Sequence, residues 1–157
     1  MTGLDLTQFK NLIIRPALDC LRLQSEAAVN LVTATALVES SLCYLQQMED
    51  GPAIGLFQME PRTHDDLYEN FLNFRPDLLQ KMQLIAGCSK PSAIEMIHNL
   101  LYAAAMCRLC YLRAKDPLPE ASDALALAVY HKVHYNTIAG KADIKRNLPL
   151  FEAAIHA

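Results

Sequence analysis

The chain has 157 residues, of which 52% are hydrophobic and 20% are charged. These proportions are those of one globular domain with its own core, and they exclude a disordered chain. The formal net charge of −3 gives no electrostatic basis for binding nucleic acid or an anionic membrane. We therefore expect a single domain over residues 1–157 with neither of these partners.

Targeting signals and cysteine usage indicate the compartment in which the protein is made. Residues 1–5 lack the basic region and long apolar run of a signal peptide, and no apolar run is long enough to span a bilayer. The five cysteines are scattered and odd in number, which is typical of buried thiols in a reducing compartment rather than of a disulfide framework. We expect a protein made in the cytoplasm and not inserted into a membrane.

The hydrophobic pattern of residues 4–61 predicts two helices and an irregular region. Residues 4–23 form the first helical stretch, in which Pro16 ends one segment or kinks it. Ser25 is a favourable N-cap for a second helix over residues 26–40. Residues 43–61 are expected to be irregular or a short hairpin, because Asp50-Gly51-Pro52 is a strong turn signal.

The second half is predicted to be helical as well. Thr63-His64-Asp65-Asp66 has the Thr-x-x-acid form of a helix start. Four further helices are each bounded by a proline, a glycine or a capping residue: residues 76–85, 92–114, 120–135 and 141–156. Residues 124–130 are apolar on all sides, so this segment is predicted to be a central buried helix. No long stretch alternates with period two, and the expected class is all-α.

Glu39 stands where the apolar pattern of the second helix stops, on the face that carries Leu31 and Val32. Apolar surroundings and the negative end of the helix dipole both disfavour a carboxylate anion. A carboxyl group in such a place is suited to donating a proton to a glycosidic oxygen. The alternative is an ordinary glutamate exposed at a helix end.

A Gly-Leu-Phe-Gln segment follows the turn-rich loop. Gly55 permits a positive φ or a close backbone approach. Gln58 offers a donor and an acceptor, which suits a hydroxyl or N-acetyl group of a sugar. Leu56 and Phe57 would anchor the segment to the core. Taken alone, the segment also fits a packed loop.

The two motifs together are more specific. Glu39-Ser40, a loop with a turn, and then Gly55-Leu56-Phe57-Gln58-Met59 resemble the lytic transglycosylases of the goose-type lysozyme superfamily, whose signature is E-S followed by G-L-M-Q. Ala128-Val129-Tyr130 resembles the A-Y-N-A-G-like motif of that family. The resemblance covers residues 31–140 and implies a lysozyme-like fold.

The resemblance also implies a reaction. Members of the family cleave the β-1,4 bond between N-acetylmuramic acid and N-acetylglucosamine in peptidoglycan. Glu39 would protonate the leaving oxygen and then act as base while the 6-hydroxyl of the sugar closes a 1,6-anhydro ring. The partner is a glycan strand, and neither a cofactor nor a metal ion is implied.

Six further residues are predicted to bind the substrate or to support Glu39: Ser40, Gly55, Phe57, Gln58, Tyr130 and Asn136. By the resemblance, Tyr130 would hydrogen-bond near the glutamate and help to orient it. The sequence departs from the family at Phe57, where methionine is common, and after Tyr130, where His131-Lys132 stands in place of Asn-Ala-Gly. Asn136 would then take over the polar role, or that role is absent.

Two alternatives remain open at this point. A hydrolytic muramidase would need a second carboxylate, and Glu49, Asp50 and Glu60 are available on the loop. A catalytically silent wall-binding or virion structural protein would keep the same fold without the activity. A short catalytic domain without a signal peptide fits a bacteriophage protein, delivered by a particle or by a helper.

Other constellations of reactive side chains have simpler interpretations. Cys107 and Cys110 lie in an apolar helical run with no second Cys pair, so we expect core thiols rather than a zinc or redox site. His131 and His134 share a helix face without a nearby carboxylate in sequence, and no metal site is predicted. His64-Asp65-Asp66 is interpreted as a helix N-terminus with favourable acids.

Overall fold

The computed structural model describes residues 3–135 and 143–157. Within these ranges the chain forms helices and isolated β-bridges but no strand, so the predicted all-α class is confirmed. None of the described helices is long and apolar enough to cross a membrane. In chain order the elements are α1 (Leu6–Phe9), the π-helix η1 (Lys10–Ile14), α2 (Arg15–Cys20), α3 (Glu26–Ser40), α4 (Pro61–Asn70), the 3-10 helix η2 (Leu72–Phe74), α5 (Pro76–Ala86), α6 (Glu95–His98), α7 (Leu100–Leu112), α8 (Ala124–His134) and α9 (Ile144–His156).

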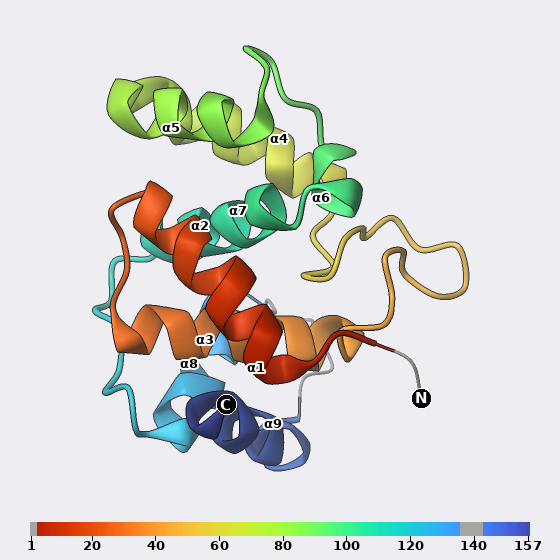
Figure 1. The fold of residues 1–157 in the computed structure, drawn as a ribbon, viewed down its shortest axis with the longest axis vertical. Helices are drawn as coiled ribbons and strands as arrows, with labels where there is room; N and C mark the ends of the chain where they lie inside the picture. The colour runs from red at the N-terminus through yellow and green to blue at the C-terminus, as the bar shows by residue number, and fades with distance from the viewer. Residues whose placement is uncertain (1–2, 136–142) are drawn as a thin grey trace.

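The centre of the fold is α3. This helix crosses the middle of the molecule, with α1 to α2 in front of it, α7 above it, and α8 and α9 below it (Figure 1). Every residue from Ala28 to Ala36 is buried. The hydroxyls of Thr33 and Thr35 donate to carbonyls one turn back in the same helix, so these polar groups are satisfied inside the core. The predicted bounds and the Ser25 cap are confirmed.

The prediction that residues 124–130 form a helix buried on every side is wrong. Leu125, Val129 and Val133 of α8 are 54%, 40% and 56% exposed. Their spacing of four residues places them on one outward stripe. Packing against α3 and α9 buries only the opposite side of α8. An apolar sequence fixes neither the depth of a helix nor the number of neighbours that it has.

Three boundaries differ from the predicted ones for local reasons. Pro61 occupies the first turn of α4, so this helix begins before Thr63. The predicted helix over residues 92–114 is two helices, because Asn99 takes an extended conformation and caps α7 by accepting from the Tyr102 N–H. The π-helix η1 precedes Pro16, and its wider turn accommodates a residue that has no N–H to donate.

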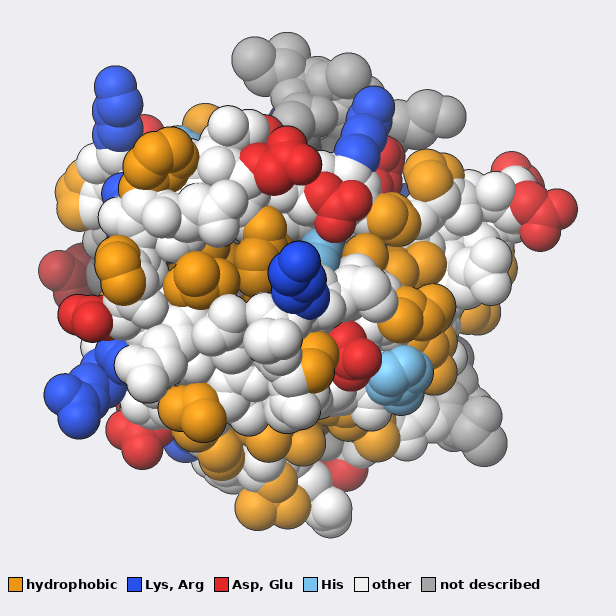
Figure 2. Space-filling model, turned by 90° about the horizontal axis from the view of Figure 1, so that it is seen from above, with side chains coloured by type: hydrophobic (Ala, Val, Ile, Leu, Met, Phe, Trp, Pro, Cys, Tyr) orange, Lys and Arg blue, Asp and Glu red, His pale blue; other side chains and the backbone are white. Residues whose placement is uncertain are grey.

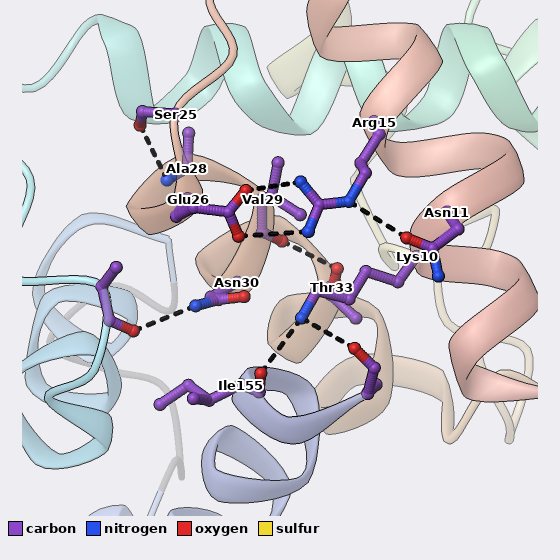
Figure 3. A network of polar contacts seen from close by, with 12 residues as sticks. Lys10, Asn11, Arg15, Ser25, Glu26, Ala28, Val29, Asn30, Thr33 and Ile155 are labelled. Carbon is purple, nitrogen blue, oxygen red and sulfur yellow. Dashed lines mark hydrogen bonds and ion pairs between the residues drawn. The ribbon is translucent and has the colours of Figure 1, made fainter.

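A buried lysine joins the two ends of the described chain. Lys10 is 2% exposed, and its Nζ donates to the carbonyls of Ala154, Ile155 and Ala157 at 2.7, 3.2 and 3.2 Å. Figure 3 shows this ammonium beside the last turn of α9, with the Arg15–Glu26 ion pair next to it. Burial, together with Arg15, lowers the pKa of Lys10. The carbonyl oxygens and the negative end of the α9 dipole favour its charged form.

We expect Lys10→Met to lower the free energy of unfolding by about 1–3 kcal/mol, because the last carbonyls of α9 would lose their donor without regaining water. Urea denaturation followed by circular dichroism measures the change. Lys145→Met is the matched control, since Lys145 is exposed on the same helix α9. Equal stability of the two variants would contradict this role of Lys10.

Candidate active site

Glu39 lies in the last turn of α3. The helix ends at Ser40, and Ser41 and Leu42 adopt left-handed conformations with φ of 52° and 56° that turn the chain away. The side chain of Glu39 is 18% exposed. The carboxyl group is therefore largely shielded by protein but still reachable from solvent.

The partner of Glu39 is a histidine of α8. His131 is 1% exposed, and its Nε2 lies 3.0 Å from Oε1 of Glu39. Within the described residues, no lysine or arginine forms an ion pair with this carboxylate. The sequence does not predict this contact, because His131 stands there as a possible metal ligand with His134 and as a departure from the family motif. The available signal was the polar residue directly after the Ala-Val-Tyr motif.

Aromatic contacts fix the imidazole and link it to the Gly-Leu-Phe-Gln segment. The ring of His131 stacks on Tyr135 with a centroid distance of 5.8 Å and an interplanar angle of 21°, and Phe151 meets it edge-on. The hydroxyl of Tyr135 donates to the Phe57 carbonyl at 2.8 Å. A continuous series of contacts therefore runs from Glu39 through His131 and Tyr135 to the backbone next to Gln58.

Three buried groups that interact electrostatically with Glu39 keep their protons. Burial raises the pKa of Cys107, Tyr111 and Tyr135 well above their usual values, and the charge of Glu39 raises each of them further. Tyr111 is also held by a hydrogen bond of 2.7 Å with Thr35 of α3. A thiol and two phenols that keep their protons form apolar surroundings for the end of α3.

Gly55 occupies the position that only glycine fits. Its φ is 73°, and a Cβ on it would lie 2.3 Å from the carbonyl oxygen of Met96. Both predicted reasons for glycine here, the positive φ and the close approach, are confirmed. Gln58 also has a positive φ, of 46°, and its Nε2 donates to the Gly55 carbonyl at 2.8 Å. The segment is closed on itself and rests on α6.

Three of the predicted site residues do not contact the carboxylate. The Ser40 hydroxyl is buried and donates to the Ala36 carbonyl at 3.0 Å. Phe57 is 2% exposed and packs against Phe9, so its side chain belongs to the core rather than to a substrate surface. The expected hydrogen bond of Tyr130 near Glu39 is wrong, since its hydroxyl donates to the Asp116 carbonyl at 2.8 Å. Asn136 lies outside the described residues.

The other candidate carboxylates lie on or beside the turn-rich loop. Glu49 and Asp50 are exposed in a tight turn, both with positive φ. Glu60 pairs with Arg62 at 2.5 Å. The loop itself carries isolated bridges from Ile54 to Gln46 and to Met59, which agrees with the prediction that residues 43–61 are irregular or a short hairpin.

A metal centre has no support in the described part of the chain, where no group of three or more His, Cys, Asp or Glu side chains is placed to hold an ion. Cys107 and Cys110 lie inside α7, and burial raises the pKa of both thiols.

Neither a family model, a curated protein nor a solved structure matches this chain.

We expect Gly55→Ala to lower the free energy of unfolding by about 2–4 kcal/mol, because it adds a collision with the Met96 carbonyl to the cost of a positive φ. Gly87→Ala is the matched control: Gly87 has a φ of 71°, but a Cβ there would meet nothing within 4 Å. This control should lose only about 1 kcal/mol. Equal losses in urea denaturation would contradict the close approach at Gly55.

Proposed function

We propose that this protein cleaves glycan strands of peptidoglycan as a lytic transglycosylase, with Glu39 as the general acid and base. The observation that carries the proposal is a single shielded carboxyl group, 18% exposed at a helix end, held by a buried histidine. The resemblance of Glu39-Ser40 and Gly55-Leu56-Phe57-Gln58 to the lytic transglycosylase signature supports the same reaction.

The proposed reaction needs one carboxyl group. Glu39 gives its proton to the bridging oxygen between N-acetylmuramic acid and N-acetylglucosamine as the bond from C1 to that oxygen breaks. The resulting carboxylate then takes the proton of the 6-hydroxyl, whose oxygen forms the new bond to C1. Glu39 is protonated again at the end, and no water is consumed.

His131 would keep the carboxyl group ready for both steps. A neutral imidazole has one ring nitrogen that accepts and one that donates. With the hydrogen on Nε2, His131 would donate to Oε1, and Oε2 would carry the proton that Glu39 gives up and later recovers. The stacking of His131 on Tyr135 fixes the ring in place during both steps.

Gln58 is the second residue that we propose to contact the substrate, beside Glu39. Its Nε2 uses one hydrogen on the Gly55 carbonyl. The second N–H and the amide oxygen are left to bind a hydroxyl or N-acetyl group. Because Tyr135 donates to the adjacent Phe57 carbonyl, the position of Gln58 is tied to the helix that carries His131.

We expect Glu39→Gln to reduce the release of soluble fragments from purified peptidoglycan at least about 100-fold, since the proton donor is lost. Mass analysis of the wild-type digest should find 1,6-anhydro ends, lighter by one water than reducing ends. Glu60→Gln is the matched control and should stay active. Reducing ends together with an inactive Glu60→Gln would support a hydrolase. A wild-type protein that releases nothing would overturn the enzyme proposal in favour of a silent wall-binding or virion protein.

We expect His131→Leu to lower kcat at least about tenfold by removing the hydrogen bond to Glu39. His131→Gln places an amide nitrogen near the position of Nε2 and should retain most of the activity. The pH profile of kcat should change in the leucine variant and not in the glutamine variant. Identical kcat values and pH profiles for wild type and both variants would exclude a role of His131 in the reaction.

A further inference from the structure

A second polar site lies on the far side of α7 from α3. A pocket of about 370 Å³ is formed by α4, α5 and residues 89–91. Its lining includes His64, Asp65, Tyr68, Glu69, Gln83 and Lys90. The end of the molecule that α4 and α5 form faces the viewer in Figure 2, where acidic, basic and histidine side chains lie close together.

The wall of this pocket contains a buried hydrogen-bonded chain. His64 lies in the N-terminal turn of α4, as predicted, and is 1% exposed. Its Nδ1 lies 2.9 Å from the Asp65 carboxylate, and its Nε2 lies 2.7 Å from the Tyr102 hydroxyl. Tyr102 is in turn 2.8 Å from the hydroxyl of Tyr68. Both ends of the chain, Asp65 and Tyr68, line the pocket.

The hydrogen-bonded chain leaves an acceptor at each of its ends. Nδ1 of His64 lies next to one oxygen of the Asp65 carboxylate, so the other oxygen is open to a ligand. Burial raises the pKa of Tyr68 and of Tyr102, so both phenols keep their protons. Whichever of the two hydroxyls donates in the hydrogen bond between them, the Tyr68 oxygen keeps a lone pair for a ligand.

The α4 side of the pocket consequently offers acceptors. These are the second carboxylate oxygen of Asp65, the phenol oxygen of Tyr68 and the carboxylate of Glu69. The segment after α5 contributes the opposite charge, Lys90. Within the described residues neither Glu69 nor Lys90 forms an ion pair, so both charges remain available to a ligand.

We propose that this pocket binds an amino-acid zwitterion, such as a free amino acid or a short peptide. The ammonium group would donate to Asp65, Tyr68 and Glu69, and the carboxylate would pair with Lys90. An ammonium has three donors and no acceptor, which matches a wall of acceptors. This site is independent of Glu39 and of the reaction proposed above.

The test is a titration of the ¹⁵N-labelled protein, followed by heteronuclear NMR, with three probes. L-alanyl-L-alanine carries both charges, its N-acetyl form lacks the ammonium, and its C-terminal amide lacks the carboxylate. We expect the dipeptide to bind with a Kd of about 1 mM and to shift the resonances of Tyr68, Gln83 and Lys90. The N-acetyl form should bind at least about tenfold more weakly. Comparison with L-alanine distinguishes a peptide from a free amino acid as the ligand.

Three variants assign the contacts. Tyr68→Phe keeps the ring and should weaken binding of the dipeptide about fivefold, because the acceptor is lost. Lys90→Gln should weaken binding of the dipeptide about fivefold but leave the affinity of the amide unchanged. Lys115→Gln, which changes an exposed charge after α7, should bind like the wild type. The spectrum of each variant reports whether it is folded.

Several results would overturn the proposal. One is equal binding of the dipeptide and its N-acetyl form, and another is the absence of shifts in the pocket up to about 50 mM dipeptide. A loss of affinity in Lys90→Gln that is the same for the dipeptide and the amide would also contradict the assigned contact. Chitotriose that shifts the pocket resonances more strongly than the dipeptide would identify a sugar site instead.

Discussion

The fold depends on the burial of α3, because η1, α7, α8 and α9 pack against this helix and α4 to α6 are attached to it through α7. The stretch from Ala28 to Ala36 is rich in alanine and threonine, and these small side chains allow neighbouring helices to approach from several sides. Threonine hydroxyls that bond within the helix leave no unpaired donor in the core. The end of such a helix is held in a defined place, and that is where Glu39 stands. A carboxyl group positioned in this way needs only one well-placed partner to be oriented.

Polar groups in the interior have hydrogen-bond partners, because burying such a group without one costs free energy. Lys10 has three carbonyl acceptors, His131 has Glu39, and His64 has Asp65 and Tyr102. Among the described residues, the Oδ1 of Asn30 is the buried side-chain oxygen that has none. Apart from His64 with Asp65, which are neighbours in α4, each of these contacts joins helices far apart in the sequence. They select one arrangement of the helices, whereas apolar packing alone tolerates several.

Several features of the fold could be predicted from local signals in the sequence. The cap of α3 at Ser25, the need for glycine at position 55 and the stop of α5 at Gly87 each depend on a residue and its immediate neighbours. Local signals did not predict the rotation of a helix about its axis, which decides which of its side chains face the neighbouring helices. Tyr130 and His131 are adjacent and differ by about 100° around α8, and only the packing of α8 against α3 decides which of them meets Glu39. The exposed stripe of Leu125, Val129 and Val133 was missed for the same reason, because an apolar pattern does not state how many neighbours a helix has.

Two carboxyl–imidazole pairs of the described residues have a buried histidine, and they differ in how far solvent reaches the acid. In both pairs, a buried histidine lies within hydrogen-bond distance of an acid and beside a tyrosine. The Asp65 side chain is 65% exposed, whereas that of Glu39 is 18% exposed. The carboxylate of Asp65 is open to solvent and to a ligand, whereas the carboxyl group of Glu39 is shielded at the end of α3. This difference in access is the reason why we place the proposed proton transfer at the end of α3 and the proposed ligand binding at α4.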